Sequence, residues 1–399
     1  MKLSAKQQAI REVYQKIFTE SSICENNMQN VFTRYELCED IINKIKHESD
    51  TKILALNLEF AIILIERGIS PNCIDFWTDC KDKADVAIKI GVNVMSDDFF
   101  DFFDRVRKHE ETRKWDLVIG NPPYQDPQAK SSKKLWKPFL RMSIEILKNN
   151  GYLAFITPFS WGTPDNDIFD VFVKNQVKMV NLDGKKYFPD VGTTISWYII
   201  QKTPTTNLTE IICNDEKIMV DFRSIVFLPS DINKVTIDIL GKFLSVSPKL
   251  NIKYDFFCEQ RKPIMSTTQN NVYKYPVKHT ASQLLYSSVP HPNTKIKKVV
   301  FPISSAMKAE YDGNGDYGCS QHYAWIEVKN KHEADSIIAY LNSDIIRWLR
   351  KVTHWSASWS RPILDMIPLI STNTVPTNES IYETFHINSL EQEYIRSYK

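Results

Sequence analysis

Two apolar patterns alternate through the first 160 residues, and together they predict a sheet covered by helices. We expect buried strands where short apolar runs are bounded by polar residues, at 52–56, 73–78, 92–95, 116–119 and 151–157. We expect helices where apolar residues recur every three or four positions, at 3–20, 34–47, 59–67, 81–90 and 135–148. This alternation is typical of βαβ units, so the predicted class is α/β, with a parallel sheet and helices on both faces.

The pattern changes near residue 205, where Thr, Asn, Ser and Pro become more frequent and the apolar runs become shorter. We therefore expect two domains, at 1–204 and 205–399, because 399 residues are enough for both to bury a core. Near the end of the second domain an amphipathic pattern predicts a helix over 334–350. Three tryptophans lie close to it: Trp348, Trp355 and Trp359.

Charge is distributed unevenly along the chain, although the net charge is only +2. Between Lys242 and Lys308 there are ten lysines and one arginine against Asp255 and Glu259, which makes this stretch +9 and leaves −7 for the rest. A basic segment on a nearly neutral protein indicates either a local contact with a polyanion or a solvated lysine-rich face. The charges alone do not separate these two interpretations.

The seven cysteines are scattered and form no CxxC pair, which is typical of a reducing compartment and predicts no metal site. The first residues contain no apolar signal core, and no run of 18 apolar residues is long enough to span a membrane. We therefore expect a cytoplasmic protein without a membrane partner.

One tetrapeptide carries recognisable chemistry: Asn121-Pro122-Pro123-Tyr124, directly after the strand expected at 116–119 and Gly120. An exocyclic amine of a base is a poor nucleophile, because its lone pair is delocalised into the ring. The Asn121 side-chain oxygen and the Pro122 carbonyl can both accept its hydrogens, and Pro-Pro gives a stiff chain that presents carbonyls. Tyr124 can stack on a base that has left the duplex. The alternative is a surface turn after a strand.

With this motif the chain resembles the gamma-class amino-methyltransferases of restriction-modification systems. Four further segments carry the resemblance: Phe32-Thr33 before a helix, Asp98-Phe99 after the third strand, the stretch 150–161 (NGYLAFITPFSW), and Phe188-Pro189 before the strand 196–201. The resemblance covers roughly residues 30–202. It implies a Rossmann-like methyltransferase sheet that uses S-adenosylmethionine, with Phe188 at the wall of the target-base pocket.

The resemblance also implies which residues hold the cofactor. Thr33 belongs near its methionine end, and Asp98-Phe99 near its adenine. Asp79 stands where the family has a ribose-binding carboxylate, although the same residue suits a helix N-cap. The family's glycine-containing first motif is replaced here by the glycine-free stretch 53–61, in which Asn57 or Glu59 takes the place of the acidic residue, and bulky Leu58 and Phe60 are expected to crowd the start of the helix.

The second domain resembles the target-recognition part of the same enzymes. It contains Lys297 and Lys298, which are candidate phosphate contacts or, equally, solvated lysines. The implied partner is double-stranded DNA. Because the sequence shows no recognisable nuclease motif, we expect any restriction endonuclease to be a separate polypeptide.

The predicted reaction is therefore methylation of adenine N6 in a flipped-out base, without a metal. Three alternatives stay open. The same acceptors suit cytosine N4, and they also suit an RNA base or a protein glutamine amide. The glycine-free first motif also allows a DNA-binding protein that has the methyltransferase fold without the cofactor.

Overall fold

The computed structural model describes residues 33–96, 98–125, 134–164, 166–188, 194–255, 262–303, 308–355 and 359–398. The helix expected at 3–20 lies outside these residues. The chain forms two compact units, Met1–Gly162 with Asn166–Val226, and Thr163–Asp165 with Phe227–Lys399. The expected division at 205 precedes two strands of the first unit, β8 (Thr209–Cys213) and β9 (Glu216–Val220), so the units divide about twenty residues later.

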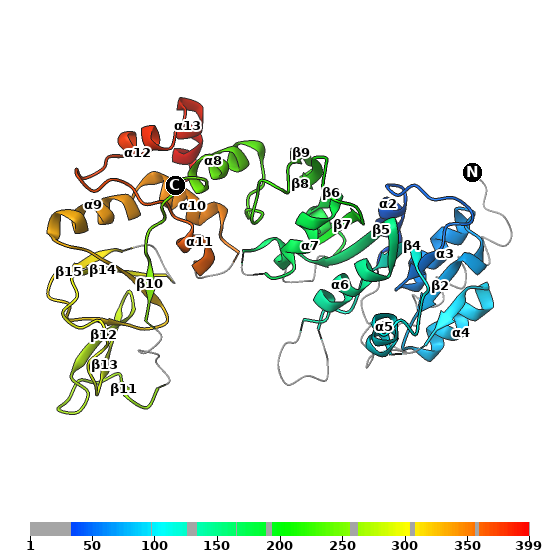
Figure 1. The fold of residues 1–399 in the computed structure, drawn as a ribbon, viewed down its shortest axis with the longest axis horizontal. Coiled ribbons are helices and arrows are strands. Elements are labelled where there is room, and N and C mark those ends of the chain that lie inside the picture. The colour runs from blue at the N-terminus through cyan, green and yellow to red at the C-terminus, as the bar shows by residue number, and fades with distance from the viewer. Residues whose placement is uncertain are drawn as a thin grey trace. The chain divides into compact units, whose positions relative to one another are not determined.

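The first unit is built on one nine-stranded sheet in the order β3-β2-β1-β4-β5-β7-β6-β8-β9 (Figure 1). Its other strands are β1 (Ile53–Ala55), β2 (Ile74–Trp77), β3 (Asn93–Met95), β4 (Trp115–Gly120), β5 (Leu147–Pro158), β6 (Gln176–Asn181) and β7 (Ile195–Gln201). The strands from β3 to β5 are parallel to one another, whereas β7 is antiparallel to both of its neighbours. The carboxyl ends of β1 to β4 therefore lie along the same edge.

Helices cover both faces of this sheet. They are α2 (Tyr35–Ile42), α3 (Leu58–Glu66), α4 (Lys81–Ile90), α5 (Phe99–Arg107), α6 (Trp136–Ile146) and α7 (Phe169–Lys174). Apolar residues of α2, α3 and α4 share one core cluster with strand residues such as Ile119 and Ile199. On the opposite face, α6 packs through Phe139 on Trp77, and α7 packs through Phe172 on Tyr198. The α/β class with helices on both faces is confirmed, on a sheet that is mixed rather than wholly parallel.

In its described residues, the second unit combines two small sheets with six helices. The sheets have the orders β10-β17-β14-β15 and β11-β13-β12-β16. Their strands are β10 (Lys253–Tyr254), β11 (Met265–Ser266), β12 (Tyr275–Thr280), β13 (Gln283–Ser287), β14 (Lys298–Pro302), β15 (Glu310–Asp312), β16 (Gly318–Cys319) and β17 (Tyr323–Glu327). The helices are α8 (Lys234–Leu244), α9 (Lys331–Leu341), α10 (Asp344–Val352), α11 (Arg361–Asp365), α12 (Asn378–Thr384) and α13 (Ser389–Ser397). Among the described residues, no helix is both long and apolar enough to cross a membrane.

The single helix expected over 334–350 is wrong, because the chain forms two helices there. The first helix, α9, ends with Asn342 as its C-cap, and Ser343 becomes the N-cap of α10. The backbone N–H of Asp344 donates to Asn378 Oδ1 at 2.9 Å, so α12 satisfies a donor at the start of α10. Both helices keep an apolar face toward the same core, which is why the amphipathic pattern runs across the break.

The first and fourth strands approach closely at their carboxyl ends, and Gly120 makes this approach possible. A Cβ atom added at Gly120 would lie 2.6 Å from Leu56 Cβ and 2.9 Å from Asn57 Oδ1. Both distances are shorter than van der Waals contact, so a side chain at this position would separate the two strands. The requirement for glycine here is one of space between neighbouring strand ends.

Lys298 is a buried ion-pair residue, which corrects its expected role as a phosphate contact. Its side chain is 0% exposed, and its Nζ lies 3.2 Å from Asp312 Oδ2 across the β14–β15 pair. The ammonium also donates to the Asn293 carbonyl at 3.1 Å. The Asp312 carboxylate accepts two further bonds, from the backbone N–H groups of Asp316 and Tyr317. An ammonium held in this way cannot exchange its partners for a DNA phosphate without breaking the interior of the unit.

We predict that Gly120→Ala destabilises the protein by about 1–3 kcal/mol, because overpacking a closed contact forces the backbone to shift. Gly241→Ala is the matched control. Gly241 lies within α8 with open space around an added Cβ, so alanine there should stabilise by about 0.5–1 kcal/mol. Urea denaturation of both variants measures this difference. Equal midpoints for the two variants would contradict the close contact.

We predict that Lys298→Ala lowers the free energy of unfolding by about 3–5 kcal/mol, since it leaves the Asp312 carboxylate buried without its counter-charge. The neighbouring Lys297 is exposed, and Lys297→Ala should change stability by less than about 0.5 kcal/mol. The fluorescence of Trp325, whose ring centre lies 5.9 Å from Lys298 Nζ, is a local probe of the transition. Similar unfolding of the two variants would show that the pair contributes little.

Candidate functional site

Asn121 directly follows β4, and its backbone and side chain are held by two other segments. Its backbone N–H donates to Asn57 Oδ1 at 2.5 Å, which links the end of β4 to the residue after β1. Its side-chain Nδ2 lies 3.4 Å from Thr33 Oγ1. Its Oδ1 is buried and accepts no hydrogen bond from any described residue. The side chain therefore presents an oriented acceptor without a protein donor.

Tyr124 ends the tetrapeptide and is similarly buried and unpaired at its polar end. Pro122 and Pro123, which connect it to Asn121, are buried. The Tyr124 carbonyl accepts from the N–H of Leu135 at 3.0 Å, which fixes the segment to the start of α6. Burial raises the pKa of the Tyr124 hydroxyl far above its ordinary value, with a smaller contribution from Tyr198. The nearby Asn121 side chain offsets part of this rise in the pKa. Even so, no described residue lies at hydrogen-bond geometry to the Tyr124 hydroxyl.

Thr33 and Glu59 complete the group around Asn121. Glu59 lies in the first turn of α3 and is 4% exposed, and its Oε1 lies 3.4 Å from the backbone N of Thr33. Burial raises the pKa of the Glu59 carboxyl, and the positive charge of Lys83 opposes the rise. Asn57 contributes through its hydrogen bond to Asn121, so its side-chain oxygen is already occupied. The structure thus brings together Thr33, Asn57, Glu59 and Asn121.

The glycine-free first motif is accommodated by inward packing. Leu58 and Phe60 are buried in the core cluster of the first unit, and neither lines the cavity described below. The expected crowding of the helix start by these two side chains is therefore not what the structure shows. Their apolar bulk is directed to the core, and the close approach at this edge is made by Gly120 of the neighbouring strand.

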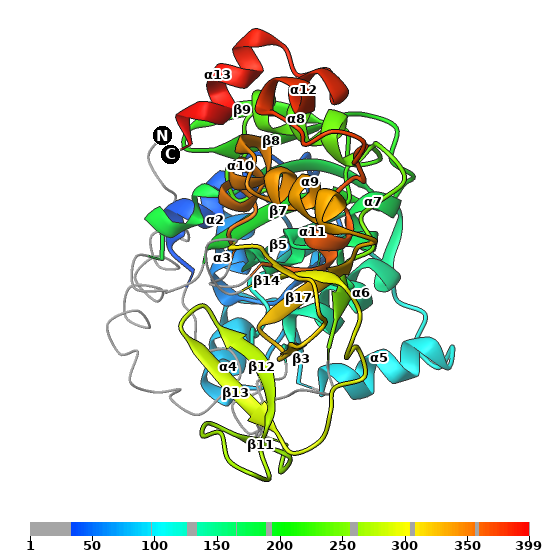
Figure 2. The ribbon, with the colours of Figure 1, turned by 90° about the vertical axis from the view of Figure 1, so that its left-hand side faces the viewer.

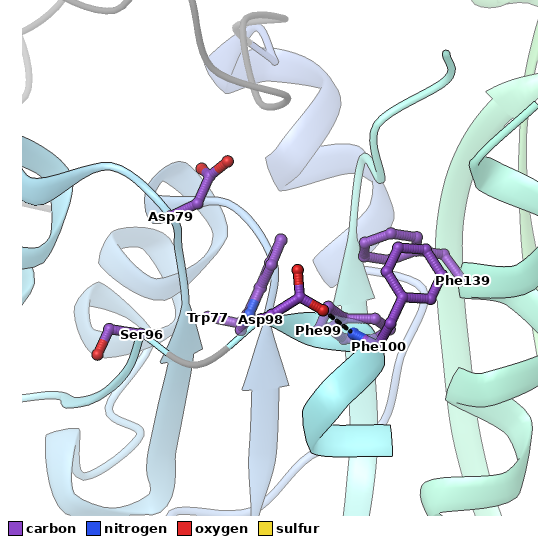
Figure 3. A pocket seen from close by; sticks show the side chains of 7 residues that line it. All are labelled: Trp77, Asp79, Ser96, Asp98, Phe99, Phe100 and Phe139. Carbon is purple, nitrogen blue, oxygen red and sulfur yellow. Dashed lines mark hydrogen bonds between the residues drawn. The ribbon is translucent and has the colours of Figure 1, made fainter. Parts of the chain in front are cut away.

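A cavity of about 250 Å³ lies at the carboxyl ends of β2 and β3. Figure 3 shows the seven residues that line it: Trp77, Asp79, Ser96, Asp98, Phe99, Phe100 and Phe139. Two exposed carboxylates and several aromatic rings thus share one space. The sequence analysis identified Asp79, Asp98 and Phe99 but missed the other four. Ser96 could have been predicted from the sequence, because it directly follows an expected strand. Phe139 could not, because it belongs to α6 and no local pattern relates it to this edge of the sheet.

The two carboxylates of the cavity have different local roles. Asp98 is the N-cap of α5, and its Oδ1 accepts from the N–H groups of Phe100 and Asp101 at 2.8 and 3.1 Å. Asp79 is not a helix cap, because the N-cap position of α4 is Cys80. The Asp79 carboxylate makes no hydrogen bond within the described part of the chain. Its alternative interpretation as an N-cap is therefore wrong.

Aromatic stacking shapes the wall of this cavity. The rings of Phe99 and Phe139 are parallel, with centroids 4.1 Å apart, and Trp77 meets both of them edge to face. Phe99 is 1% exposed and Phe139 is fully buried. The stack connects α5, α6 and β2, so it gives the cavity a rigid apolar side opposite its carboxylates.

The remaining candidate residues are Phe188 in the first unit and Lys297 and Lys298 in the second unit. Phe188 is buried in the same core cluster on which Tyr124 packs. Lys297 is exposed and forms no ion pair with any described residue. Many basic residues of the segment 242–308 are neutralised locally, since Lys242, Lys253, Lys278 and Lys298 pair with Glu391, Glu327, Glu310 and Asp312. Four exposed lysines have no such partner among the described residues: Lys274, Lys295, Lys297 and Lys308.

Parts of this chain are similar to known proteins. Residues 9–188 match the family described as Eco57I restriction-modification methylase. A putative type II restriction enzyme and methyltransferase from Methanocaldococcus jannaschii is 38% identical over 60 residues, which are 12% of this chain and 5% of that protein. An uncharacterised adenine-specific methylase from Mycoplasma pneumoniae is 29% identical over 124 residues, 28% of each chain. This chain therefore aligns with less than a third of either curated relative.

A solved structure resembles a larger part of the chain. The type IIL restriction-modification enzyme MmeI in complex with DNA aligns with 94% of this chain and 68% of its own, with a TM-score of 0.50 and 9% identity, which indicates a shared fold. Residues 9–188 of this chain, a little under half of its length, are thus similar to the Eco57I restriction-modification methylase family.

Proposed function

We propose that this protein transfers a methyl group from S-adenosylmethionine to adenine N6 of a flipped-out base in DNA. The observation that carries the proposal is the buried, unpartnered Asn121 Oδ1 at the end of β4. A buried acceptor without a partner costs free energy, so its presence at a strand end is explained by a ligand that donates to it.

The cavity and the Glu59 group fit the two ends of the cofactor. Asp79 and Asp98 offer carboxylate oxygens to the hydroxyl and amine donors of an adenosine. The aromatic rings that line the same cavity suit contact with its purine. Glu59 and Thr33 lie beside Asn121, and the Glu59 carboxylate suits the ammonium of a methionine. When bound, S-adenosylmethionine supplies a methyl group on a sulfonium, which is open to attack by a nitrogen lone pair.

The chain contributes orientation and electrostatics to this reaction. Asn121 Oδ1 and the Pro122 carbonyl accept the two hydrogens of the target amine, which returns electron density to its nitrogen. The Tyr124 ring stacks on the base and holds it in place. Asn57 positions Asn121 through the backbone bond and touches no substrate atom. Positioning of two reactants and stabilisation of developing charge are sufficient for catalysis of this type.

Double-stranded DNA is the proposed substrate, with the second unit as the part that recognises the target sequence. The unpaired lysines of that unit support this assignment, because exposed lysines attract phosphates and displace their counterions. The MmeI structure was determined with DNA, and its fold extends over most of this chain. A restriction endonuclease that acts on the same sequence is proposed as the functional counterpart of this methyl transfer.

We predict that Asn121→Ala reduces methyl transfer by about 100-fold or more, because the transition state loses a preorganised partner. Stability should change little, because the alanine removes an unpartnered oxygen and opens no large core cavity. Labelled methyl incorporation into genomic DNA from a host without adenine methylation measures the rate. Tyr124→Ala should be milder, and Tyr124→Phe milder still, because stacking needs the ring.

Nucleoside analysis of the same DNA identifies the base that is modified. N6-methyladenine supports the proposal, whereas N4-methylcytosine would show that the same site methylates the exocyclic amine of cytosine instead. If Asn121→Ala kept the activity of the wild type, Asn121 would have no role in methyl transfer and the proposed site would be wrong.

We predict that S-adenosylmethionine binding weakens as the pH falls, because a cationic ammonium favours the ionised form of Glu59. Burial raises the pKa of this carboxyl, so the decline begins at a higher pH than an exposed glutamate would give. Calorimetry between about pH 5 and pH 7 measures affinity and proton release together. Glu59→Gln should bind more weakly and lose this pH dependence. An absence of heat at millimolar ligand with DNA present would favour a cofactor-free binding protein.

A further inference from the structure

The second unit contains a long stretch without acidic residues, which includes three of the four strands of the β11-β13-β12-β16 sheet. Residues 260–309 include no Asp or Glu, whereas the average of 48 in 399 residues would give about six. The same stretch contains seven lysines, Arg261 and two histidines. It includes β11, β12 and β13 complete, so this sheet carries the charge asymmetry as a structural element.

The sheet has one face in the core and one directed outward. Val277 and Leu285 are opposite each other in the register and are buried. The alternate pairs Pro276–Tyr286 and Lys278–Leu284 occupy the other face and are partly exposed. Within the second unit the three strands lie on the side away from α12 and α13, in both views (Figures 1 and 2). The side chains of the second face are therefore partly open to solvent.

The loop between β11 and β12 is ordered by its own hydrogen bonds. Asn270 Oδ1 accepts from the N–H groups of Val272 and Tyr273, each at 2.9 Å, and the Asn270 N–H donates to the Tyr273 carbonyl. At the start of the loop, Ser266 Oγ exchanges bonds with Thr268. These bonds leave the side-chain amides of Gln269 and Asn271 exposed, without a hydrogen bond to any described residue.

We propose that the 267–274 loop and the β12–β13 hairpin enter the major groove of DNA and read the target sequence. The hairpin is a two-stranded antiparallel ribbon, and a groove about 12 Å wide admits such a ribbon. Glutamine and asparagine amides match the donor and acceptor of adenine in that groove. Lys274, exposed and unpaired at the end of the loop, provides the phosphate contact. The loop and the hairpin carry no carboxylate of their own, and the Glu310 carboxylate beside them is paired with Lys278, so repulsion from the DNA backbone is small.

This assignment rests on the proposed DNA methylation, and the test separates the two. Three variants are compared with the wild-type chain. The first is a double variant that combines Gln269→Ala and Asn271→Ala, and the other two are the single variants Lys274→Ala and Asn373→Ala. Asn373 is an exposed amide of the same unit outside the acid-free stretch, so it is the matched control. Genome sequencing after expression in a host without adenine methylation gives the methylated motif, and anisotropy with a mixed-sequence duplex gives affinity at several salt concentrations.

The double amide variant should lose about 5- to 150-fold in preference for the wild-type motif over its single-base variants. Lys274→Ala should weaken duplex binding and reduce the salt slope by about 1. Asn373→Ala should change neither. An unchanged motif and affinity in the double variant would overturn the proposal, as would equal binding to single-stranded RNA. If the wild type methylates nothing while Lys274→Ala still reduces duplex binding and its salt slope, the groove contact stands and the methylation proposal fails.

Discussion

The contact between the ends of β1 and β4 is the constraint on which the rest of the first unit depends. Asn57 accepts the backbone N–H of Asn121, and Gly120 lets the two strand ends meet. This contact fixes where β4 releases the chain, and therefore where the Asn121 acceptor and the rigid Pro-Pro segment lie. The neighbouring strands β2 and β3 then place their own cavity along the same edge.

This arrangement explains how the sheet accommodates the glycine-free segment 53–61 at its first strand. A glycine after β1 lets a ligand approach the backbone closely. In this chain the close approach is between the end of β4 and residues Leu56 and Asn57 after β1, and Gly120 of β4 provides the space for it. The large residues after β1 are then free to extend the apolar core.

Much of this fold was predictable from local patterns, because buried strands and amphipathic helices each produce a characteristic spacing of apolar residues in the sequence. Asn121, Asp79 and Asp98 were predictable for a related reason, since the residues after parallel strands meet at one edge. Phe139 and the Lys298–Asp312 pair were not, because helix packing and strand register bring them together from distant positions. The break between α9 and α10 depends on Asn378, 34 residues away from Asp344.

The contrast between Lys298 and its exposed neighbour has a practical consequence. Salt screens charges in water over about 8 Å at physiological ionic strength, whereas a fully buried pair is shielded from ions by the surrounding protein. Under the proposed function, concentrated salt should therefore detach nucleic acid from the surface lysines and leave the interior pair intact. A high-salt wash should then remove bound nucleic acid while the Lys298–Asp312 pair stays closed.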